Sequence, residues 1–66
     1  MKNTIIKITS LAKGAAFLTI HNGGRKSKPR RFVGIDEALQ FAVSAGNRQS
    51  TLYVNGYEYT PYAWVA

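Results

Sequence analysis

The Asn55-Gly56 pair constrains the fold of this chain more than any other feature. Asn-Gly favours a two-residue type I′ turn, whose twist matches that of two paired antiparallel strands. The turn therefore predicts a hairpin over residues 51–60 and sets its register. In that register one face carries only aliphatic and aromatic side chains: Leu52, Val54, Tyr57 and Tyr59. We expect this face to pack against the core, with Tyr57 and Tyr59 buried.

Residues 35–45 have the period of an amphipathic helix. Their apolar side chains cover one broad arc: Ile35, Ala38, Leu39, Phe41, Ala42, Val43 and Ala45. Asp36 and Glu37 lie in the first turn, where negative charge complements the helix dipole. Gly46-Asn47 follows, and it predicts that the helix ends in left-handed backbone geometry.

Four further segments read as strands. Residues 4–9 and 15–21 are rich in β-branched and apolar residues, and a turn at Lys13-Gly14 would join them in an antiparallel hairpin. Alternation gives each strand one apolar face, formed by Ile6 and Ile8 in the first and by Ala16, Leu18 and Ile20 in the second. Residues 30–33 predict a third strand, and residues 62–65 a short last one.

These segments predict an α+β fold, an antiparallel sheet of 4–5 short strands in the order β-β-β-α-β-β, packed on one face by a single α-helix. We expect one domain over residues 1–66, with a basic loop at 22–31. A chain of 66 residues buries only about 60% of its unfolded surface, so the core is small. Because the chain has no cysteine, apolar packing must hold it together without disulfides or thiolate-bound metal. We expect no cofactor and no metal.

The N-terminal region is not apolar enough for a targeting or membrane segment. Its longest apolar run covers residues 15–18, whereas a signal peptide needs roughly 7–15 such residues and a membrane span about 20. We therefore expect no membrane association and a cytoplasmic location.

Charge is distributed unevenly along the chain. Residues 1–34 contain eight Lys and Arg residues and no acid, whereas residues 35–66 contain one arginine and three acids, which gives the net charge of +6. Five of the nine basic residues lie between Arg25 and Arg31. Such a field attracts polyanions or acidic protein surfaces. The cluster is also compatible with a solvated loop on a protein that is merely basic.

The first functional hypothesis is binding of nucleic acid, with DNA favoured as the target. Lysine and arginine side chains would neutralise phosphates, and Gly23-Gly24 would let the backbone of the loop approach them. The candidate phosphate-binding residues are Lys13, Arg25, Lys26, Lys28, Arg30 and Arg31. Phosphate contacts position a protein without reading bases, so the sequence predicts no base specificity.

The second hypothesis is binding to an acidic protein surface, through the basic loop and the aromatic C-terminal tail. Five aromatic residues lie between Tyr53 and Trp64. If Tyr57 and Tyr59 belong to the core, then Tyr53, Tyr62 and Trp64 are the candidate contacts, either for a partner protein or for stacking on bases. The chain would act as a monomer or a homodimer.

Catalysis is not expected. His21 is the only histidine, and the acids nearest to it in sequence, Asp36 and Glu37, are adjacent on a helix, so their side chains diverge. The serines lack a histidine–acid partner set, and Gly23-Gly24 lacks the spacing of a phosphate loop. We therefore expect a binding protein and not an enzyme.

The order hairpin, loop, strand, helix and closing strand, with a helix that opens Ile35-Asp36-Glu37-Ala38-Leu39, resembles small bacteriophage-encoded inhibitors of host enzymes. The resemblance covers about a dozen residues around that helix. It implies a phage or prokaryotic accessory protein that inhibits or modulates a host protein, and it transfers no functional residue to this chain.

Overall fold

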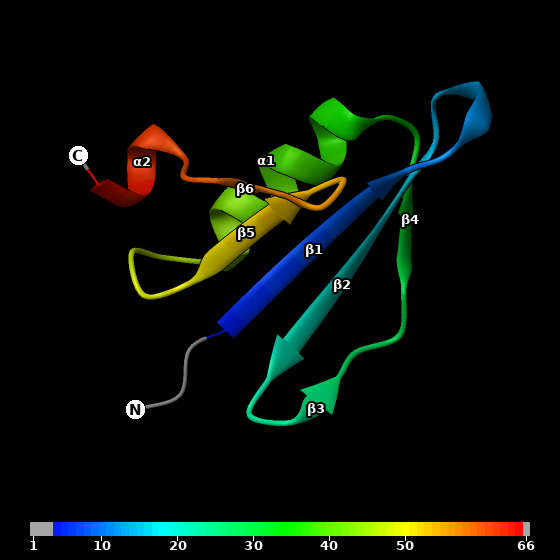
Figure 1. The fold of residues 1–66 in the computed structure, drawn as a ribbon. Coiled ribbons are helices and arrows are strands. Elements are labelled where there is room, and N and C mark those ends of the chain that lie inside the picture. Colours follow the sequence, from blue (N-terminus) through cyan, green and yellow to red (C-terminus); the bar gives the residue numbers. More distant parts are fainter. Residues whose placement is uncertain (1–3, 66) are drawn as a thin grey trace.

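In the computed structural model, which describes residues 4–65, the chain forms one sheet with helices on one side (Figure 1). Its elements, in chain order, are β1 (Thr4–Ser10), a 3₁₀ turn η1 (Ala12–Gly14), β2 (Ala16–Asn22), β3 (Arg25–Lys26), β4 (Arg30–Phe32), α1 (Ile35–Ala45), β5 (Thr51–Val54), β6 (Tyr57–Tyr59) and α2 (Tyr62–Val65). The expected α+β class and the helix over residues 35–45 are confirmed.

The sheet is mixed, and this corrects the expectation that all strands are antiparallel. Its order is β3-β2-β1-β5-β6, and β4 pairs with β2 beside β3. Strands β1 and β5 run parallel, whereas the other pairs are antiparallel. The chain reaches the parallel position because α1 carries it across the face of the sheet before β5 begins, which is the usual route to a parallel pair. The two-residue strand β3 brings the count to six.

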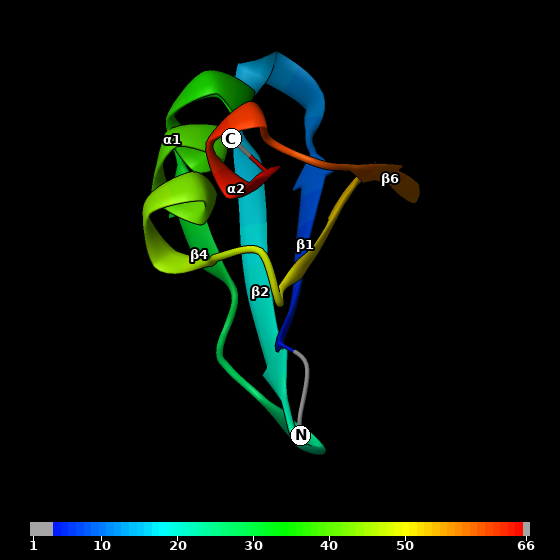
Figure 2. The same cartoon turned by 90° about the vertical axis from the view of Figure 1, so that its left-hand side faces the viewer.

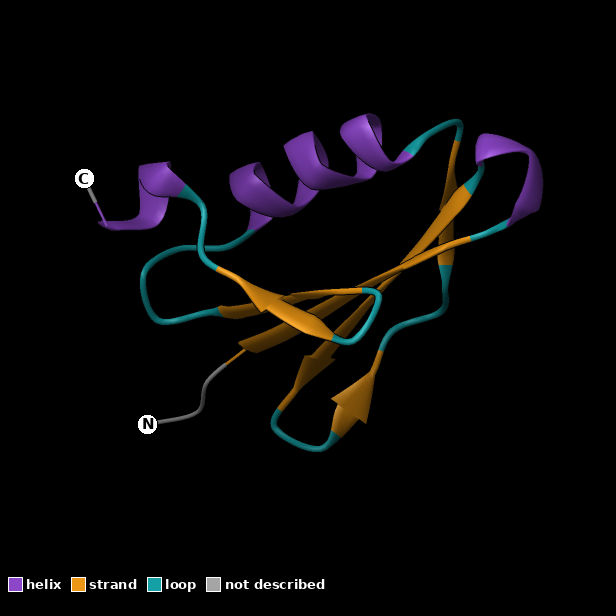
Figure 3. Ribbon diagram, turned by 45° about the horizontal axis from the view of Figure 1, so that its top comes forward, coloured by secondary structure: helices purple, strands orange, loops and turns teal. Residues whose placement is uncertain are grey.

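The core lies between the sheet and α1. The buried strand residues are those expected from alternation: Ile6, Ile8, Ala16, Leu18 and Leu52. Ala38 and Ala42 face them from α1, and both are fully buried, because a methyl side chain lets the helix approach the sheet closely. Figures 2 and 3 show α1 and α2 on the same side of the sheet, which leaves its other side uncovered by helices.

The hairpin around Asn55-Gly56 forms as predicted. Asn55 and Gly56 have positive φ angles of 54° and 86°, and Leu52 pairs with Tyr59 and Val54 with Tyr57. The Asn55 side chain also ties this turn to the end of β1. Its Oδ1 accepts the backbone N–H of Ser10 at 2.8 Å, and its Nδ2 donates to the Ser10 hydroxyl at 3.0 Å.

Tyr57 and Tyr59 do not join the core, which corrects the prediction that they are buried. Tyr57 is 79% exposed and Tyr59 49% exposed. Both point to the same side of the sheet as α1, but β6 is the edge strand. Tyr59 only borders a hollow against Leu39 and Val43 of α1. The predicted register of the hairpin is confirmed. The exposure of Tyr57 and Tyr59 depends on how far α1 extends over the sheet.

The C-terminal segment is the short helix α2, where the sequence predicted a strand. The backbone N–H of Trp64 donates to the carbonyl of Pro61, which forms the turn. The turn brings the indole into the core, where Trp64 is 5% exposed and its Nε1 donates to the carbonyl of Val43 at 3.1 Å. The buried indole and its hydrogen bond to Val43 thus join α2 to α1.

Gly46 ends α1, but it does not adopt the left-handed conformation that the sequence predicted. Its φ and ψ are −106° and −175°, an extended conformation, and its N–H donates to the carbonyl of Ala42. The reason for glycine here is space, because a Cβ at this position would lie 2.5 Å from Cζ2 of Trp64.

Candidate nucleic-acid interface

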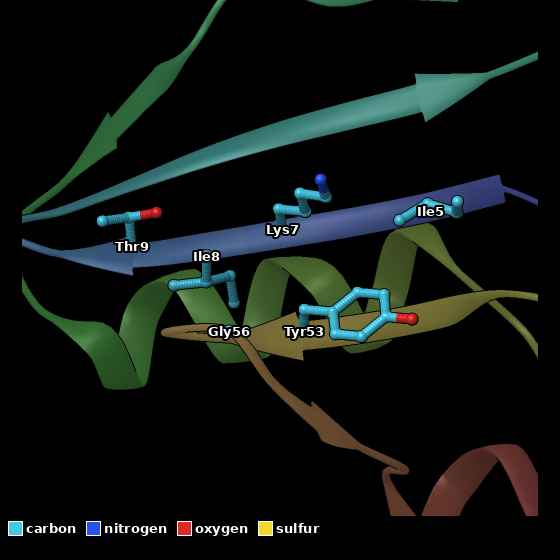
Figure 4. Close-up of a pocket in the computed structure, with 6 residues that line it drawn as sticks. All are labelled: Ile5, Lys7, Ile8, Thr9, Tyr53 and Gly56. Carbon is cyan, nitrogen blue, oxygen red and sulfur yellow. The ribbon is translucent and has the colours of Figure 1, made fainter. Parts of the chain in front are cut away.

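The side of the sheet opposite α1 is not covered by a helix, and we call it the open face. Alternation with the buried residues and the strand register assign to it Ile5, Lys7, Thr9, Phe17, Thr19, His21, Lys26, Arg31, Thr51, Tyr53 and Glu58. Figure 4 shows four of these side chains on the near side of the strands, with α1 behind the sheet. The open face mixes cations, small polar residues and two aromatic rings.

Two aromatic side chains lie on the two strands that flank β1. Phe17 on β2 is 37% exposed and lies opposite Thr9, and Tyr53 on β5 is partly buried and lies opposite Lys7. The two positions are therefore two strand spacings and two residues apart, which corresponds to about 12 Å across the sheet. Lys7 occupies the central strand between them.

A shallow hollow adjoins Tyr53. Its volume is about 510 Å³, and Figure 4 shows the residues that line it, Ile5, Lys7, Ile8, Thr9, Tyr53 and Gly56. The side chains there are aliphatic and hydroxyl groups beside one ammonium and one phenol.

Three basic side chains belong to the open face. Lys7 lies at its centre, Lys26 lies opposite His21 on β3, and Arg31 lies opposite Phe17 on β4. Lys13 lines a second hollow, of about 350 Å³, together with Arg31 and Val33 at the end of the sheet where β1 turns into β2. Glu58, opposite Tyr53, adds a negative charge at the β6 edge.

Arg30 and Arg31, adjacent in sequence, lie on opposite sides of the sheet. Arg30 lies opposite Leu18, on the side of α1, and its guanidinium carbon lies 4.7 Å from the centroid of the Phe41 ring and 5.6 Å from that of Phe32. An arginine in this position makes cation–π contacts that join β4 to α1. The six predicted phosphate-binding residues therefore do not form one surface.

The basic segment 22–31 is not wholly a loop, which corrects the sequence prediction. Gly23 and Gly24 form a tight turn with φ angles of 62° and 88°, and β3 then pairs with β2. Ser27 extends this contact, because its N–H donates to the Ile20 carbonyl at 2.9 Å and its Oγ accepts the Ile20 N–H at 3.0 Å. Lys28 lies in the exposed connection between β3 and β4. Most of the segment is thus bonded to the sheet edge.

The three aromatic contact candidates have different positions. Tyr53 lies on the open face, Tyr62 is 82% exposed on α2, and Trp64 is in the core. The expectation that Trp64 is available to a partner is therefore wrong, because its indole fills the space beside Gly46. Phe17 and Lys7 were not among the candidates. Both alternate with buried residues in strands with one apolar face, and that pattern was the signal that they point away from the core.

Two kinds of site are absent from residues 4–65. In that range no three or more His, Asp or Glu side chains are grouped so that they could hold a metal ion. Within the same residues, neither helix is long and apolar enough to cross a membrane.

No family model, curated protein or solved structure matches this chain.

Proposed function

We propose that this protein binds nucleic acid through the open face and the basic edge formed by β3 and β4. The observation that supports it best is the grouping of Lys7, Lys26 and Arg31 with two aromatic rings on one face that no helix covers. Phosphates are attracted by such cations, and the counterions that they release favour binding.

Two further cations lie at the basic edge. Arg25 on β3 lies opposite Asn22 of β2, on the α1 side of the sheet, and Lys28 follows in the exposed connection. Lys13 adds a charge at the other end of the sheet, beside Arg31. Because β3 and β4 pair with β2, strand hydrogen bonds hold the backbone at Arg25, Lys26 and Arg31, so less conformational entropy is lost on binding than for a free loop.

The test is the salt dependence of binding. A fluorescently labelled oligonucleotide is titrated with the protein between about 50 and 200 mM salt, a range in which phosphate contacts change affinity steeply. We expect the affinity to fall as salt rises, and Lys26→Ala with Arg31→Ala to reduce the slope of log K against log salt by about 1.4 to 1.8. Arg48→Ala, which removes a cation from the loop between α1 and β5, is the charge control. Binding that is absent, or that ignores salt, overturns the proposal.

Binding to an acidic protein surface is the second candidate function. It is favoured by exposed apolar side chains at β6 and α2, where Tyr57 is 79%, Tyr62 82% and Val65 65% exposed. Exposed apolar side chains of this kind recur at protein interfaces. In an inhibitor or modulator of a host protein, these residues would contact the partner from the β6 side of the sheet, the edge opposite β3 and β4. Capture from nuclease-treated bacterial lysate separates the candidates, because one stoichiometric protein that remains after nuclease treatment favours this function.

A further inference from the structure

We infer that the nucleic acid is single-stranded and that two of its bases stack on Phe17 and Tyr53. This inference rests on the proposed function and names the substrate class for the same surface. Stacking on an aromatic side chain needs a base whose ring face is free, and paired bases inside a duplex hide their faces in the stack.

The first observation behind this inference is the location of the two aromatic rings. Phe17 and Tyr53 lie on β2 and β5, the strands on either side of the central strand β1, and not on a protruding loop. On the broad face of a sheet such rings can support unpaired bases that lie flat on them. An exposed phenyl ring also costs free energy in water, and at Phe17 it is 37% exposed with Thr9 and Arg31 as its cross-strand neighbours.

The second observation is the location of the basic side chains relative to the two rings. Lys7 lies between the strands that bear the two rings and directly opposite Tyr53, so its ammonium can reach a phosphate between stacked bases. Arg31 lies opposite Phe17 and can contact a phosphate on the outer side of that base. A cation therefore accompanies each ring, as expected of a surface that follows a sugar–phosphate backbone.

The helix is unsuited to the other main mode of binding, insertion into the major groove of a duplex. The apolar side of α1 is used by the core, where Ala38 and Ala42 are buried. Its exposed side carries Asp36 and Glu37, and the helix contains no lysine or arginine. Phosphates on either side of a groove would be repelled by these carboxylates. The open face is thus the surface that suits nucleic acid, and it suits a single strand.

The experiment compares one labelled mixed-sequence 12-nucleotide strand with the same strand in a duplex, at equal salt. We expect the protein to bind the single strand more tightly. We expect Phe17→Leu and Tyr53→Leu, which remove the ring but keep an apolar side chain, each to weaken single-strand binding about 5- to 100-fold. Tyr57→Leu is the matched control, because Tyr57 is exposed on a strand but points to the other side of the sheet, and it should leave affinity unchanged.

A second measurement needs no variant and so does not depend on the variants' folding. In the wild-type complex, NMR should give nuclear Overhauser contacts between base protons and the ring protons of Phe17 and Tyr53. Any one of three results overturns the single-strand inference. They are equal affinity for duplex and single strand, absence of those contacts, and an affinity for poly-glutamate equal to that for the single strand. If the salt-dependent effect of Lys26→Ala with Arg31→Ala then persists, the proposed function stands. If neither nucleic acid binds with salt dependence, both fail.

Discussion

Gly46 and Trp64 are in such close contact that a methyl group on Gly46 would lie 2.5 Å from Cζ2 and 2.9 Å from the neighbouring Cη2 of the indole. Gly46 ends α1 and Trp64 lies in α2, so this contact joins the two helices. Because Gly46 is extended, no backbone strain accompanies a side chain there. Any cost of substitution is therefore steric.

Gly46→Ala should lower the free energy of unfolding by about 1–3 kcal/mol through overpacking. The measurement is a double-mutant cycle with Trp64→Phe, which removes Cζ2 and Cη2, the two atoms nearest to the new methyl, and leaves Ser50 Oγ at 3.1 Å. We expect Gly46→Ala to cost less in the Trp64→Phe background, with a coupling of about 0.5 kcal/mol or more. Costs that simply add in urea denaturation would show that the two residues do not clash.

Truncation after Pro61 should unfold most of the protein and not merely remove a binding tail. Loss of a buried Trp64 costs about 3–5 kcal/mol, and the total stability of a domain of this size is of the order of 3–10 kcal/mol. Circular dichroism and the dispersion of NMR amide signals measure the effect. Tyr62→Ala is the control, since Tyr62 is 82% exposed on the same helix and should leave the spectra unchanged. A truncated chain with the same free energy of unfolding as the full chain would refute the assignment of Trp64 to the core.

Arg30 and Arg31 should differ in what their removal affects. Arg30→Ala removes cation–π contacts with Phe32 and Phe41, and each such contact at an exposed site is worth about 0.5–1 kcal/mol. The two contacts together are worth about 1–2 kcal/mol, so we expect the melting temperature to fall by about 4–16 °C. Arg31→Ala should melt close to wild type, within about 2 °C, but bind nucleic acid more weakly. The same loss of stability in both variants would contradict the placement of the two arginines on opposite faces.

Asn55 should stabilise the protein in two separable ways, through its backbone conformation and through its side chain. Asn55→Gly keeps the positive φ but loses the two hydrogen bonds to Ser10, so it should cost about 0.5–1.5 kcal/mol. Asn55→Ala loses the bonds and also disfavours a φ of 54°, so it should cost about 1 kcal/mol more. Chemical denaturation of the two variants gives the difference, and equal costs would show that the turn geometry contributes nothing.

Glu58 should weaken nucleic-acid binding in the wild-type protein. It lies opposite Tyr53 on the open face, where its carboxylate would repel the phosphate of a base stacked on Tyr53. We expect Glu58→Gln to raise single-strand affinity by a few-fold at low salt and by less at high salt, because salt screens exposed charges. Asp36→Asn on α1, which also removes one negative charge, is the control and should raise the single-strand affinity by less. An equal gain from both variants would mean that only net charge matters.

Local patterns in the chain were sufficient for much of this architecture. The Asn55-Gly56 turn and its register, the helix over residues 35–45 and the two apolar strand faces depend on backbone preferences and on alternation within a few residues. Such interactions act over short distances along the chain, so the residues that set them are adjacent in the sequence.

The remaining features were decided by tertiary packing. The parallel pairing of β1 with β5, the exposure of Tyr57, the burial of Trp64 and the role of Gly46 each depend on elements distant in sequence. Alternation within the strand predicted over residues 30–33 already places Arg30 and Arg31 on opposite sides, and pairing with β2 decides only which of the two faces α1. Side-chain contacts across the core depend on how the helices lie over the sheet, and no short segment contains that information.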